Sequence, residues 1–85
     1  MSTYIEITYK QGSILRILRK QRGISQLNLE AQAQLSPGSI SRIENNKTNP
    51  TKETLFKLAV ILQLSREEIV DLFAINELLK IQPTH

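Results

Sequence analysis

The sequence contains no cysteine, and this absence excludes several kinds of protein at once. Without a thiol, the chain has no disulfide bond, no thiolate metal site and no cysteine nucleophile. Its 85 residues are enough for one domain. A domain of this size without cross-links depends on helix packing, on a partner subunit, or on both for its stability.

Long apolar segments are also missing. The longest apolar run covers the five residues 58–62, whereas a helix that crosses a membrane needs about 20. The amino terminus has no basic segment followed by an apolar one, so it lacks the pattern of a secretion signal. We therefore expect a cytoplasmic protein with no membrane contact.

Groups that carry out catalysis are scarce. The single histidine is the final residue, His85, and it has no partner for acid–base or metal chemistry. There is no glycine-rich phosphate loop, and the pair Glu67 and Glu68 is explained by a helix cap. We therefore expect no enzymatic activity, no bound metal and no cofactor.

The charge is unevenly distributed along the chain, although the net charge is only +3. Residues 1–47 contain seven basic and three acidic side chains, a net charge of +4. Residues 48–85 contain four basic and five acidic side chains, a net charge of −1. A basic half on a small domain is typical of a surface that binds phosphate groups.

Apolar residues recur with helical spacing from residue 12 onward, which predicts an all-α fold of five helices. The helices are expected over residues 12–22, 25–33, 36–45, 51–62 and from 65 into the apolar segment 75–81. Their predicted starts are Ser25, Ser36 followed by Pro37, Thr51, and Ser65 with Glu68 as a capping box. The predicted core is Leu15, Leu18, Leu29, Ala33, Ile40, Ile43, Leu55, Leu58, Ala59, Leu62, Ile69, Leu72 and Phe73.

The first residues follow a different pattern. Apolar and polar residues alternate from Thr3 to Tyr9, which predicts a short β-strand. No second strand is predicted, so this one either pairs with a copy of itself or keeps its backbone groups in water. We divide the chain into an N-terminal extension over 1–11, a helical domain over 12–74 with a two-helix unit at 26–45, and a tail over 75–85.

The helical domain resembles the lambda-repressor and Cro-like helix-turn-helix domains, the xenobiotic response element family. The matching residues are Leu15, Leu18, Arg19, Arg22-Gly23, Ser25-Gln26, Leu29, Ala33, Ser36, Ile40-Ser41, Ile43-Glu44, Asn49-Pro50, Thr54-Leu55 and Leu58-Ala59. Three positions depart from the family pattern: Glu30 replaces a small alanine, Gln34 replaces the glycine of the turn, and Asn46 replaces a glycine after the second helix.

The resemblance implies a DNA-binding surface on the second helix of the unit, the recognition helix. It places Gln26 on a phosphate and Pro37, Gly38 and Arg42 nearest the base edges. Arg42 is the strongest candidate for base readout, by two hydrogen bonds to guanine, with a phosphate contact or a surface salt bridge as the alternatives. The further contacts expected around that helix come from Ser36, Ser39, Ser41, Asn46 and Lys47.

Two family positions have an architectural role instead. The resemblance implies that Arg19 and Glu44 form a buried ion pair between the first helix and the end of the recognition helix.

From the resemblance as a whole, we expect the chain to be a sequence-specific transcriptional regulator, a repressor. It is expected to read the major groove of double-stranded DNA with a helix starting near Ser36.

A homodimer is expected, because one short recognition helix reads too few base pairs for selectivity against ~10⁶ or more competing sites. The alternative function is a module that acts through a protein partner, in the manner of an antitoxin or a co-activator. It rests on Ile14, Ile17 and Leu27, apolar residues at positions that are usually polar in the family.

Overall fold

Five α-helices make up the computed structural model, which describes residues 10–80, with side chains up to Phe73. The helices are α2 Gln11–Gln21, α3 Gln26–Ala33, α4 Ser39–Glu44, α5 Lys52–Ile61 and α6 Arg66–Lys80. No strand occurs within residues 10–80, so the predicted all-α, five-helix fold is confirmed. The strand predicted from Thr3 to Tyr9 lies outside the described residues. The first six residues of the predicted tail continue α6.

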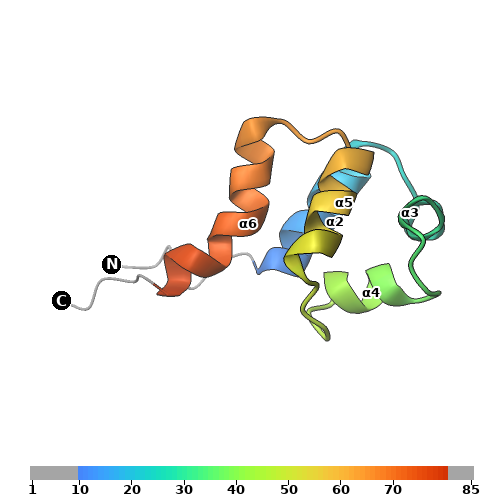
Figure 1. Cartoon of the computed structure of the whole chain (residues 1–85), viewed down its shortest axis with the longest axis horizontal. Helices are drawn as coiled ribbons and strands as arrows, with labels where there is room; N and C mark the ends of the chain where they lie inside the picture. Colours follow the sequence, from blue (N-terminus) through green and yellow to red (C-terminus); the bar gives the residue numbers. More distant parts are fainter. Residues whose placement is uncertain (1–9, 81–85) are drawn as a thin grey trace.

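The helices are arranged so that the shortest one, α4, runs along one edge of the molecule (Figure 1). α3 lies on one side of the fold and α6 on the other. α2 packs against α4 and α6, whereas α3 packs against α4 and α5. No helix in the described part of the chain is long and apolar enough to cross a membrane.

The core is built from leucine and isoleucine side chains of all five helices. Leu15, Leu29, Ile40, Leu58, Leu62 and Leu72 are fully buried. Burying one such side chain stabilises a fold by about 1.5–3 kcal/mol. Two of the predicted core residues are only half-buried, which corrects the prediction for Ile69 and Phe73. Phe73 still packs against the edge of the core, and its ring also contacts the exposed Phe56, with ring centroids 4.8 Å apart.

Three of the predicted helix caps are present. The Ser25 and Thr51 hydroxyls accept the N–H groups of Asn28 and Thr54, at 3.0 and 3.1 Å. The capping box is also formed, because the Glu68 carboxylate accepts the Ser65 N–H and the Ser65 hydroxyl accepts the Glu68 N–H. The sequence alone therefore locates the starts of α3, α5 and α6.

Arg22 connects the end of α2 to the start of α6. Its Nε donates to the Leu62 carbonyl at 2.9 Å, and its guanidinium pairs with the Glu68 carboxylate. The hydrogen bond from Arg22, and next that from the Ser65 N–H, hold the pKa of Glu68 below its ordinary value. The ion pair joins two segments that lie 46 positions apart in the sequence.

The lowered pKa of Glu68 predicts a dependence of stability on pH. The folded state favours the ionised carboxylate, so its contribution is complete above the ordinary glutamate pKa and is lost as the pH falls through the lowered value. We expect Glu68→Gln to lower the melting temperature at pH 7 and to lower it much less at pH 3. Glu67→Gln, at an exposed neighbour, is the control. An equal effect of Glu68→Gln at both pH values would contradict the prediction.

Candidate nucleic-acid interface

α4 turns one side to the core and the other side to solvent. Ile40 and Ile43 are buried beneath it, whereas Arg42 is exposed. The predicted site residues divide between two levels of exposure. Ser36, Pro37, Arg42, Asn46 and Lys47 are exposed, and Gln26, Gly38, Ser39 and Ser41 are half-buried.

The start of α4 differs from the prediction. The helix begins at Ser39, not near Ser36, and its N-cap residue is Gly38. Gly38 has a φ of +86°, a left-handed conformation that cannot belong to an α-helix, so the helix cannot extend back to Pro37. Ser36 does not cap the helix: its hydroxyl lies 3.0 Å from the Ser39 hydroxyl, and its carbonyl accepts the Ser39 N–H.

The cap of α4 comes instead from the neighbouring helix α3. Glu30 is buried, and its Oε2 accepts the N–H of Ile40 at 3.0 Å. This N–H belongs to the first turn of α4 and has no acceptor within the helix. The residue that departs from the family pattern therefore supplies what Ser36 was expected to supply.

The other end of α4 is held by the Glu44 carboxylate. Arg19 donates from Nε to Oε2 at 2.5 Å and from Nη2 to Oε1 at 3.1 Å. Both side chains are buried, with exposed fractions of 9% for Arg19 and 2% for Glu44. Gln26 adds a third hydrogen bond, from Nε2 to Oε1 at 2.9 Å, and so lies next to the ion pair. Arg19 also donates from Nη1 to the Ile24 carbonyl.

The segment after α4 is tied to the first turn of α2. Asn46 has a φ of 59°, and its Oδ1 accepts the N–H of Gly12 at 3.1 Å. The structure therefore shows Asn46 capping α2, while its contact with the DNA backbone stays a prediction. The neighbouring Lys47 donates its backbone N–H to the Arg42 carbonyl at 2.8 Å. This hydrogen bond fixes the position of Lys47 directly after the recognition helix.

Arg42 lies over the first turn of its own helix. Its Nη2 is 3.5 Å from the Ser39 hydroxyl, and a Cβ added to Gly38 would come within 3.0 Å of its Nη1. The guanidinium is exposed there, with its planar donor groups available to an incoming ligand. Arg42 makes no salt bridge among the described residues, so the structure does not show the surface salt bridge that was one alternative role for it.

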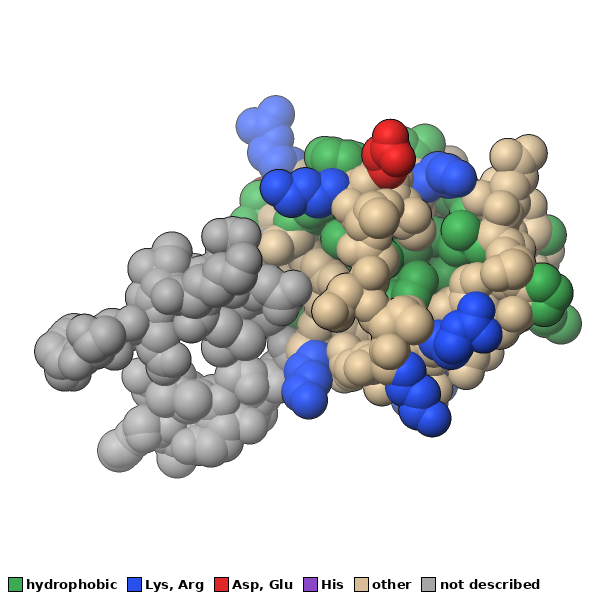
Figure 2. Space-filling view, turned by 60° about the horizontal axis from the view of Figure 1, so that its bottom comes forward, with side chains coloured by type: hydrophobic (Ala, Val, Ile, Leu, Met, Phe, Trp, Pro, Cys, Tyr) green, Lys and Arg blue, Asp and Glu red, His purple; other side chains and the backbone are tan. Residues whose placement is uncertain are grey.

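The surface that contains α4 has a basic rim. Figure 2 views the molecule from this side and shows lysine and arginine side chains around an area of uncharged side chains and backbone, with an acidic side chain at the upper edge. Arg42, Lys47 and Lys10 are exposed, and all three carry a positive charge. A concentration of positive charge attracts phosphate groups over a range of about 8–10 Å at moderate salt.

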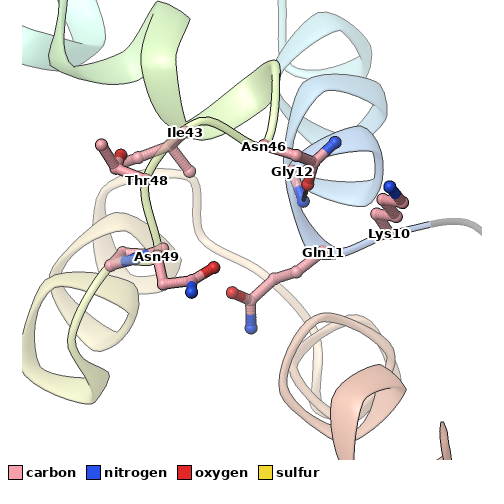
Figure 3. A pocket seen from close by; sticks show the side chains of 8 residues that line it. Lys10, Gln11, Gly12, Ile43, Asn46, Thr48 and Asn49 are labelled. Atoms are coloured by element: carbon pink, nitrogen blue, oxygen red, sulfur yellow. Dashed lines mark hydrogen bonds between the residues drawn. The ribbon is translucent and has the colours of Figure 1, made fainter.

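A shallow hollow of about 300 Å³ lies between the start of α2 and the loop after α4. Lys10, Gln11, Asn46, Thr48 and Asn49 contribute to its lining, and Gln11 and Asn49 face each other across it (Figure 3). The sequence did not indicate Lys10, Thr48 or Asn49 as DNA-contacting residues. The run of polar residues over 45–49, which includes Lys47, could have indicated Thr48 and Asn49. The position of Lys10 depends instead on the packing of α2 against α4.

Comparison with known proteins matches this architecture. A helix-turn-helix family model matches residues 15–69 of the chain. An uncharacterised HTH-type transcriptional regulator of Sinorhizobium fredii, y4dJ, is 37% identical over 59 residues, which are 69% of this chain and 77% of the relative. No significant match to a solved structure was found.

Proposed function

The chain belongs to the helix-turn-helix family, and from this premise we propose that it is a sequence-specific DNA-binding transcriptional regulator. The recognition helix is α4, and it enters the major groove with Arg42 toward the base edges. The observation that supports this most directly is the exposed guanidinium of Arg42 on a short helix whose other side is buried in the core. A short helix held in this way presents its exposed side chains in a defined direction.

Selection of bound sites from random duplex DNA tests the proposal. We expect enrichment of one short sequence motif by the wild-type chain. The motif should contain a guanine in each half-site, because guanine presents O6 and N7 to an arginine in the major groove. A selection that enriches no motif would contradict sequence-specific binding.

Phosphate contacts are proposed for the residues around α4. Lys47 and Lys10 carry the charge, and the Ser36 and Ser39 hydroxyls at the start of the helix are hydrogen-bond donors. Gln26 is a weaker candidate than the sequence suggested, because its side-chain amide already donates to Glu44. Such contacts supply affinity and orientation but do not read the sequence.

Substitution of two basic residues should separate base readout from phosphate binding. Arg42→Ala is expected to relax base preference at one position of each half-site, at a cost of about 1–3 kcal/mol for the preferred sequence. Lys47→Ala is expected to weaken binding to all sequences equally and to reduce the slope of log affinity against log salt by about one unit. Titrations with selected and random duplexes at several salt concentrations measure both effects.

Arg66→Ala provides the control for these two variants. Arg66 is exposed at the start of α6, at the end of the fold remote from α4 (Figure 1). Its removal should leave the affinity and the salt slope nearly unchanged. If Arg42→Ala weakens selected and random DNA equally, Arg42 contacts a phosphate and not a base.

We further propose that the protein binds DNA as a homodimer and acts as a repressor. Two recognition helices about 34 Å apart would read two half-sites on one face of the duplex. The selected motif should then consist of two inverted half-sites, and a single half-site would contradict the dimer. Repression is expected to appear as reduced expression of a reporter gene whose promoter contains the selected site.

A second candidate function is binding to a protein partner. Leu27 is 75% exposed on α3, and Phe56, Val60 and Val70 are exposed on α5 and α6, whereas Ile14 is half-buried against the core. Exposed apolar side chains of this kind can form a protein contact. Binding to random DNA at two salt concentrations distinguishes the two functions, because a module that binds only protein shows no salt-dependent DNA binding.

A further inference from the structure

Glu30 is a buried carboxylate whose position needs an explanation. The residue is 4% exposed, and within residues 10–73 no lysine or arginine forms an ion pair with it. A buried charge without a partner is strongly unfavourable. Its observed partner is the backbone N–H of Ile40, which Oε2 accepts at 3.0 Å. A carboxylate at a helix N-terminus is stabilised by such an N–H and by the helix dipole.

This hydrogen bond acts on a helix that cannot be stable by itself. α4 has six residues, and helices of that length form only when tertiary contacts hold them. Glu30 of α3 binds its first turn, and the Arg19–Glu44 pair binds its last residue. Two buried carboxylates therefore hold the two ends of α4 against α3 and α2.

The two ends differ in how many side-chain hydrogen bonds tie them to the other helices. At the last turn, Glu44 accepts three hydrogen bonds, two from Arg19 and one from Gln26. At the first turn, the N-cap residue is Gly38, which has no side chain to accept an N–H of α4. The Glu30 carboxylate joins that end to α3, beside the Ser36 carbonyl that accepts the Ser39 N–H, and the exposed Arg42 guanidinium lies over the same turn.

We propose that Glu30 is a positioning residue for DNA recognition: by holding the first turn of α4, it sets the direction in which Arg42 approaches the bases. This inference rests on the proposed DNA-binding function. Glu30 itself touches no DNA, because it is buried beneath the helix. Its contribution is to specificity, since a tilted α4 misplaces Arg42 relative to the base edges but leaves the phosphate contacts of Lys47 in place.

The inference is tested with three substitutions in the full chain. Glu30→Ala removes the acceptor, Glu30→Asp shortens it by one methylene but keeps the charge, and Glu30→Gln keeps the length and an acceptor oxygen. Two quantities are measured at a temperature where each variant is folded. One is the hydrogen-exchange rate of the Ile40 amide in the free protein, relative to the Leu29 amide in α3. The other is the ratio of affinities for the selected site and for random DNA.

We expect faster exchange at Ile40 in Glu30→Ala and Glu30→Asp, together with a specificity ratio about tenfold lower, the value of one base contact. Glu30→Gln should restore the ratio to within about threefold of wild type, because its oxygen still accepts the Ile40 N–H. Glu67→Gln, at an exposed glutamate, should change neither quantity.

Two results would overturn the inference. One is a folded Glu30→Ala or Glu30→Asp variant with the wild-type specificity ratio, which shows that Glu30 affects stability alone. The other is a Glu30→Gln variant with the ratio of the alanine variant despite a protected Ile40 amide. Should Glu30→Ala fail to fold, the aspartate and glutamine variants decide. A wild-type chain that selects no motif contradicts the proposed function instead, while the exchange of Ile40 still reports on the hydrogen bond.

Discussion

Replacing either Arg19 or Glu44 by alanine is expected to lower the free energy of unfolding by about 3–5 kcal/mol. The two side chains are buried and joined by two hydrogen bonds, so removal of one leaves the other charge without its partner in the interior. Glu44→Ala also leaves the Gln26 amide without its acceptor. Urea unfolding followed by circular dichroism measures the change in the free energy of unfolding.

A double variant separates the cost of an unpaired charge from the value of the pair itself. Arg19→Met combined with Glu44→Leu removes both charges and keeps apolar volume at the site. It should destabilise the fold by less than the sum of the two alanine variants, because no isolated charge stays buried. Arg22→Ala, which breaks the more exposed pair with Glu68, should cost less than Arg19→Ala. Single alanine variants that unfold at the wild-type denaturant concentration would show that the pair is dispensable.

The sequence predicts those features of the fold that depend on residues close together in the chain. The caps at Ser25, Thr51 and Ser65 act within three residues of themselves, and the apolar spacing of each helix indicates its buried side. Local chemistry is sufficient for these caps and for the buried sides of the helices. Gln34 and Asn46, which stand where the family pattern has glycine, both have a positive φ.

The features that the sequence did not predict join residues that are far apart. Glu30 caps α4 across a separation of ten positions, and Asn46 caps α2 across 34 positions. At Ser36, a good local start signal is overridden by Gly38 in a left-handed conformation. The sequence shows that Glu30 departs from the family pattern, but only the packing of α3 against α4 shows which N–H its carboxylate accepts.

The Arg19–Glu44 pair could be predicted from the sequence only through the resemblance to known domains. Composition and spacing cannot show that two charged residues 25 positions apart are both buried and face each other. Lys10 illustrates the opposite case, because neither a local pattern nor the family pattern selects it. Its place beside Asn46 and Asn49 follows from the contact between α2 and α4.

The contact between α2 and α4 is also the reason for the second large loss of stability, which we expect on substitution of Gly12. Replacing Gly12 by alanine is expected to destabilise the fold by about 3 kcal/mol, at the upper end of the range for overpacked sites. The added Cβ would overlap the Ile43 carbonyl oxygen and lie 2.8 Å from Asn46 Oδ1. These atoms belong to the end of α4 and to the cap of α2, so the two helices have to separate.

The expected loss of stability at Gly12 is opposite in sign to the effect that helix propensity predicts. Helix propensity alone predicts that glycine to alanine inside a helix stabilises the fold, by about 0.5–1 kcal/mol. Gly23→Ala is the matched control: no atom lies within 4 Å of its added Cβ, and its φ of +69° limits the expected cost to about 1–2 kcal/mol of backbone strain. Thermal unfolding of both variants gives the comparison. If Gly12→Ala is more stable than wild type, α2 and α4 are not in close contact there, and the hydrogen bond between Gly12 and Asn46 does not hold the end of the recognition helix.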